Sequence, residues 1–125
     1  MSDLSLMDSE LSPKELMRLR IVRRAYSHLV GIGYPPMNIW ARDGDLMASS
    51  DGKAFITINR RILTYPYHTF APIVALNIVH EICHYFQNEE ELESENLHSK
   101  KYYLSFHNEC FKHLPIIIKE LNKTR

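Results

Sequence analysis

Two histidines separated by three residues lie in the most apolar part of the chain. The segment reads His80-Glu81-Ile82-Cys83-His84 and continues the apolar stretch that ends at Val79. Residues four apart lie one above the other on an α-helix, whereas in a strand they are about 13 Å apart. The segment therefore predicts a buried helix from residue 73 to about residue 88, opened by Pro72, with both imidazoles on one face.

The pattern His-Glu-x-x-His is typical of a catalytic zinc site. His80 and His84 can bind the same ion from one helix face. Glu81, one position after the first histidine, can hold a metal-bound water molecule and take its proton. A catalytic zinc usually has three protein ligands and one water molecule, so a third ligand must come from elsewhere in the chain.

Several residues compete for the place of the third ligand. No glycine or histidine follows His84 at the spacing of a metzincin, which excludes that class. Glu109 or the acidic run at 89–95 would suit a thermolysin-like site. If residues 99–114 are helical, His107 falls on the apolar face and His98, nine residues earlier, on the polar side. That apolar face consists of Tyr103, Phe106, Cys110, Phe111 and Leu114. We therefore expect His107 to be the third ligand, with His98 as the alternative.

The segments before the histidines predict one α-helix and a small sheet. Ser12, Pro13 and Glu15 form a capping box with proline at the first position of a helix that ends near residue 31. Three β-prone segments follow, at 37–41, 46–49 and 54–58. The turns Asp43-Gly44 and Asp51-Gly52 between them predict an antiparallel three-stranded sheet.

The whole pattern predicts one α+β domain over residues 12–125, after a flexible N-terminus at 1–11. Its order is an N-terminal helix, the small antiparallel sheet, the helix with both histidines, and a C-terminal helix in which Pro115 marks a kink. A chain of 125 residues is long enough for one such core.

Charge and composition narrow the classes of partner. Fifteen Lys and Arg balance fifteen Asp and Glu, so net charge argues for neither nucleic acid nor a membrane. The longest apolar stretch, Ala71–Val79, is too short to span a bilayer. The first residues carry no basic signal-peptide pattern, and two cysteines cannot form a disulfide framework, so we expect a cytoplasmic protein. The basic stretch Lys14–Arg24 is the one segment that could contact DNA.

Three segments together resemble the SprT-like zinc metallopeptidase family. These are Ile56–Asn59, Val74–His84 and Phe106–Phe111, in the order of a strand ending in Asn, the histidine helix, and a histidine followed four residues later by an aromatic. The resemblance implies a minimal zincin-like domain with one Zn²⁺ per chain, the ligands His80, His84 and His107, and Glu81 as general base. It covers about residues 37–118.

Two features depart from the family pattern. The chain has no cysteine-rich zinc ribbon at its C-terminus, and the spacer from His84 to His107 is long. His98, followed four residues later by Tyr102, fits the histidine–aromatic pattern with a shorter spacer. Some family members cleave proteins attached to DNA, which would give the basic stretch a role.

The sequence thus predicts a zinc metallopeptidase that acts on proteins or peptides, including DNA-associated proteins. A second donor for the oxyanion is expected, and its candidates stay open: Tyr65, His98, Tyr102, Tyr103 and His113. One alternative is a non-catalytic, zinc-containing DNA- or protein-binding module. Another is a protein without metal, in which the histidines only pack.

Overall fold

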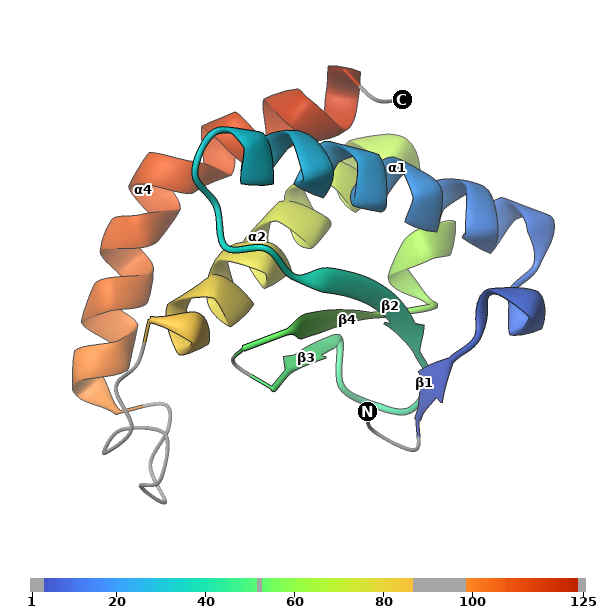
Figure 1. The fold of residues 1–125 in the computed structure, drawn as a ribbon, viewed down its shortest axis with the longest axis horizontal. Helices are drawn as coiled ribbons and strands as arrows, with labels where there is room; N and C mark the ends of the chain where they lie inside the picture. The colour runs from blue at the N-terminus through green and yellow to red at the C-terminus, as the bar shows by residue number, and fades with distance from the viewer. Residues whose placement is uncertain (1–3, 52, 87–98, 124–125) are drawn as a thin grey trace.

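The computed structural model describes residues 4–51, 53–86 and 99–123. An N-terminal helix and a small mixed sheet are followed by two helices that pack together (Figure 1). The elements are β1 (Ser5–Leu6), η1 (Asp8–Glu10), α1 (Pro13–Gly31), β2 (Asn38–Arg42), β3 (Ala48–Ser50), β4 (Phe55–Asn59), η2 (Ile62–Thr64), α2 (Tyr67–Tyr85) and α4 (Lys100–Lys123).

The start of α1 confirms the predicted capping box. The Ser12 hydroxyl accepts a hydrogen bond from the Glu15 N–H at 3.2 Å, and the Glu15 carboxylate accepts one from the Ser12 N–H at 2.8 Å. Pro13 is the first helical residue, where its missing N–H costs nothing. The same carboxylate also receives two hydrogen bonds of 2.9 Å from the guanidinium of Arg60, which joins α1 to the end of β4.

This Glu15–Arg60 pair makes folding stability depend on pH. The hydrogen bonds from Arg60 lower the pKa of Glu15 from 4.5 to about 2 in the folded protein. In the unfolded chain that pKa returns to its usual value, so at acidic pH the unfolded state binds more protons. The stabilisation is therefore complete above about pH 4.5 and is lost as the pH falls toward 2.

We expect Glu15→Gln to remove most of this pH dependence. The wild type should lose roughly 2 kcal/mol of unfolding free energy from this one group between pH 5 and pH 2, after allowance for solvent screening. Urea unfolding at several pH values measures the difference between the two proteins. An equal loss of stability in both proteins would show that Glu15 does not contribute the acid-sensitive interaction.

The sheet has the strand order β1-β2-β4-β3 and is mixed. β2 and β4 are parallel, with Ile39 opposite Ile56 and Ala41 opposite Ile58, while β1 and β3 pair antiparallel on the two outer sides. The predicted three-stranded antiparallel sheet is therefore wrong in both strand number and topology. In β4 the four residues after Phe55 are all buried, and a strand that buries both faces takes a central position.

Two side chains, Asn59 and Asp51, hold the connections between the strands. The side-chain amide of Asn59 donates to the carbonyls of Gly44 and Leu46, each at 2.8 Å, and so holds the 43–47 connection against the end of β4. The fourth strand, β1, comes from the segment that was expected to be a flexible N-terminus. Asp51 accepts backbone hydrogen bonds within the turn that joins β3 to β4, as the Asp-Gly signal predicted for that hairpin, although Gly52 itself lies outside the described residues.

The two last helices run in opposite directions and differ from the prediction mainly at their ends. The hydroxyl of Tyr67, at the start of α2, donates to the carbonyl of Leu121, near the end of α4, at 2.7 Å. α2 begins six residues earlier than predicted and includes Pro72, because the Phe70 N–H bonds to the Pro66 carbonyl and fixes the first turn. α4 continues through Pro115.

Among the described residues, no helix is both long and apolar enough to cross a membrane.

Candidate metal centre

α2 places the two motif histidines beside each other. The ring centroids of His80 and His84 lie 5.1 Å apart, and both residues are half-buried. The helix that carries them is otherwise apolar, and its residues Ile78, Val79, Ile82 and Cys83 are buried. The prediction of a buried helix with both imidazoles on one face is confirmed.

An aromatic wall on α4 covers this pair. The ring of Tyr102 stacks on His84 with centroids 4.6 Å apart and planes inclined by 17°, and it meets His80 edge-on at 5.4 Å. The Phe106 ring lies 5.5 Å from that of His80. The histidines therefore lie at the interface between α2 and α4, rather than on an open helix surface.

Glu81 is buried, with 4% of its surface exposed. Burial disfavours the charged carboxylate and raises the pKa of Glu81 from 4.5 to about 7. Its position one residue after His80 places it about 100° further round the helix axis. A carboxyl group with this pKa can both accept and return a proton near neutral pH, as a general base must.

The structure does not bring His107 to this pair. His107 is exposed, and its ring contacts that of Phe111 at 4.9 Å. The predicted apolar face of the last helix is only partly right. Phe106, Cys110 and Leu114 pack against the core, whereas Tyr103 and Phe111 are more than half exposed. The buried residues of α4 are instead Tyr102, Ile117 and Leu121. The packed side of the helix is a stripe that recurs every three or four residues and runs beside His107: Tyr102, Phe106, Cys110, Leu114, Ile117 and Leu121.

The other candidates for the third ligand also lie apart from the pair or outside the described residues. Glu109 interacts with His113 at 2.7 Å and with Lys112 at 3.3 Å. His98 and the acidic run at 89–95 belong to the part of the chain that is not described. Within residues 4–51, 53–86 and 99–123, no group of three His, Cys, Asp or Glu side chains is placed to hold a metal ion. The described residues thus offer His80 and His84 as two candidate zinc ligands, and the third ligand stays a prediction.

Two alanine variants test whether His98 or His107 is the third zinc ligand. Because His107 is exposed and its ring lies against Phe111, we expect His107→Ala to retain zinc and His98→Ala to lose most of it. Zinc content after gel filtration in a weak chelator measures both variants. Loss of zinc in His107→Ala alone would reverse this expectation and restore the sequence-based choice.

The structure gives hydrogen-bond partners for two of the candidate oxyanion donors, Tyr102 and His113. The Tyr102 hydroxyl donates to the carbonyl of His80 at 2.7 Å, so it already has an acceptor. His113 bonds to Glu109 through one ring nitrogen and to the Tyr34 hydroxyl through the other. From the sequence, Tyr102 was a candidate oxyanion donor and an aromatic residue four positions after His98. Its contact with both motif histidines was not predicted.

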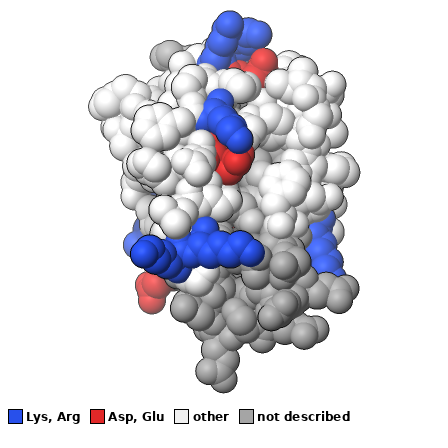
Figure 2. Space-filling model, turned by 90° about the vertical axis from the view of Figure 1, so that its left-hand side faces the viewer, with Lys and Arg blue, Asp and Glu red and all other residues white. Residues whose placement is uncertain are grey.

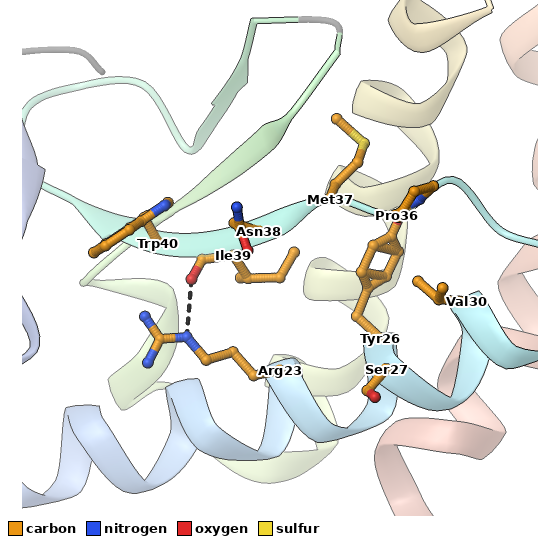
Figure 3. A pocket seen from close by; sticks show the side chains of 9 residues that line it. All are labelled: Arg23, Tyr26, Ser27, Val30, Pro36, Met37, Asn38, Ile39 and Trp40. Carbon is orange, nitrogen blue, oxygen red and sulfur yellow. Dashed lines mark hydrogen bonds between the residues drawn. The ribbon is translucent and has the colours of Figure 1, made fainter.

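Two arginines of the basic stretch Lys14–Arg24 make contacts within the protein. The guanidinium of Arg18 lies over the Phe70 ring at 4.8 Å and donates to the Tyr65 carbonyl. Arg23 forms an ion pair with Asp8 at 2.7 Å and donates to the Ile39 carbonyl at 2.9 Å. Figure 3 shows this second contact across a cavity of about 600 Å³ between α1 and β2. The contact with DNA stays a prediction.

The surface on the α4 side is not a continuous basic patch. Figure 2 shows separate lysine and arginine side chains with uncharged surface between them. Lys112 on this helix is paired with Glu109 at 3.3 Å.

Comparison with protein-family models, curated proteins and solved structures gives no match for this chain. The SprT-like resemblance therefore stays a prediction from three short segments. The geometry of α2 and α4 is what bears on the function of this chain.

Proposed function

We propose that the protein is a zinc-dependent peptidase. In this proposal His80 and His84 hold one zinc ion per chain, together with a third ligand, and Glu81 is the general base. The observation that carries the proposal is the pairing of two histidine rings on one face of α2 with a buried glutamate directly after the first of them.

The proposed mechanism is hydrolysis of a peptide bond by water. Zinc, when bound, lowers the pKa of its water to near 7 and polarises the scissile carbonyl. The Glu81 carboxylate accepts the proton of the attacking water and later delivers it to the leaving amine.

An extended peptide is the proposed substrate because the sheet offers an edge near the histidine helix. In the part of the chain that the structure describes, β3 is the last strand in the sheet order, pairs antiparallel with β4, and contacts α2. A substrate strand could add to the other side through main-chain hydrogen bonds. Such binding predicts modest sequence specificity.

The alternative of a non-catalytic zinc module is less well supported. A structural zinc site is normally closed by four ligands and has no need for a carboxyl group beside it. Burial of Glu81 carries a desolvation cost, which the raised pKa reflects. A role in proton transfer gives a reason for this cost, whereas a purely structural site does not.

Digestion of a peptide library tests the proposed activity. The protein is stripped of metal with a chelator, and half is reloaded with one equivalent of zinc. We expect new peptide termini, identified by mass spectrometry, only with the reloaded protein. Equal cleavage by the metal-free protein, or none by a preparation that contains stoichiometric zinc, would contradict the proposal.

A further inference from the structure

We infer that Tyr102 is a positioning residue for the histidine pair. It comes from α4 and contacts both His80 and His84, which belong to α2. This inference rests on the proposed function, since it concerns how the two proposed ligands are held. The role differs from that of an oxyanion donor, for which Tyr102 was a candidate from the sequence.

The first contact fixes the backbone of the motif. The hydroxyl of Tyr102 donates to the carbonyl oxygen of His80 at 2.7 Å. In an α-helix, the carbonyl of residue 80 also accepts from the N–H of residue 84, so the tyrosine bonds to the one turn that spans both histidines. Tyr102 is 2% exposed, so this bond is protected from competition with bulk water.

The second contact fixes the rotation of the rings. Tyr102 stacks on His84 with centroids 4.6 Å apart and meets His80 edge-on at 5.4 Å. Phe106 also contacts His80, and its ring is nearly parallel to that of Tyr102, with centroids 6.2 Å apart and planes inclined by 6°. A histidine against such a wall has fewer accessible ring orientations, and so loses less conformational entropy when it binds a metal.

Both contacts predict an effect on zinc affinity that is larger than the effect on the fold. Groups that orient metal ligands typically change metal affinity by about 10-fold to 100-fold when they are mutated. Tyr102→Phe removes the hydrogen bond and keeps the ring, whereas Tyr102→Leu removes both contacts. We expect the dissociation constant for zinc to rise about 10-fold in the first variant and about 100-fold in the second.

Tyr26 offers a matched control. It is also 2% exposed, and its hydroxyl donates to the Pro35 carbonyl at 2.7 Å, without contact to the histidines. Tyr26→Phe and Tyr102→Phe should therefore lower the unfolding temperature of the metal-free protein by similar amounts. Only Tyr102→Phe should weaken zinc binding.

Competition with a chromophoric chelator measures zinc affinity, and thermal unfolding of the metal-free proteins measures the fold. If Tyr102→Phe and Tyr102→Leu bind zinc as tightly as the wild type, the inference is wrong and the proposed zinc site stands. Equal weakening in Tyr26→Phe would also overturn it, because a general loss of stability would then explain the result. If the wild type itself binds no zinc, the proposed function fails together with the inference.

Discussion

Glu81→Gln should lower kcat for peptide hydrolysis by about 100-fold to 10,000-fold while zinc remains bound. Gln has nearly the same shape as Glu, but it cannot take a proton from water at neutral pH. The side chain is buried, so bulk solvent has little access to replace the missing base. The variant therefore separates proton transfer from metal binding, because His80 and His84 are unchanged.

Glu109→Gln is the matched control for this experiment. Its carboxylate lies on α4 and interacts with His113 and Lys112. We expect this variant to keep both zinc and activity. Full activity in Glu81→Gln would exclude Glu81 as the general base, and loss of zinc from that variant would show that the carboxylate helps to hold the metal.

Phe70→Ala should destabilise the fold by about 3–5 kcal/mol. The side chain is completely buried in α2, and its ring lies 5.4 Å from that of Tyr67. The guanidinium carbon of Arg18 in α1 lies 4.8 Å from the centre of the same ring. Truncation leaves a cavity and removes the aromatic ring that the Arg18 guanidinium contacts. Domains of this size are stable by only about 5–15 kcal/mol, so a large part of the total would be lost.

Phe111→Ala provides the same change at an exposed position. Phe111 is 74% exposed, and we expect its removal to change stability by less than about 0.5 kcal/mol. Urea unfolding of the two metal-free variants compares them directly. Similar effects at both positions would contradict the assignment of Phe70 to the hydrophobic core.

Local sequence signals predicted the elements better than their arrangement. Ser12, Pro13 and Glu15 identified the start of α1 because capping depends on neighbouring residues only. The three segments expected as strands also formed, with ends shifted by one or two residues. The turn at Asp43-Gly44 predicted a hairpin between β2 and β3, but β4 pairs with both strands and separates them, because its burial on both faces decides the order.

In the candidate site, too, local features were predicted and contacts between elements were not. His80, Glu81 and His84 share one helix turn, so their spacing alone predicted that the two histidines meet. The position of His107 depends on which face of α4 packs against the rest of the fold. The sequence analysis placed His107 within the apolar face, whereas the packed stripe runs through Tyr102, Phe106 and Cys110 and leaves His107 exposed. The contacts of Tyr102 depend on packing between two helices, which neither helix encodes alone.

The most direct test of the zinc site is metal stoichiometry, measured by elemental mass spectrometry on untagged protein. We predict one zinc per chain for the wild type and for His28→Ala, in which an exposed histidine that pairs with Glu120 is removed. We predict that His84→Ala loses the zinc. Absence of metal from the wild type after zinc is added and the excess removed would contradict the account, as would an unchanged zinc content in His84→Ala.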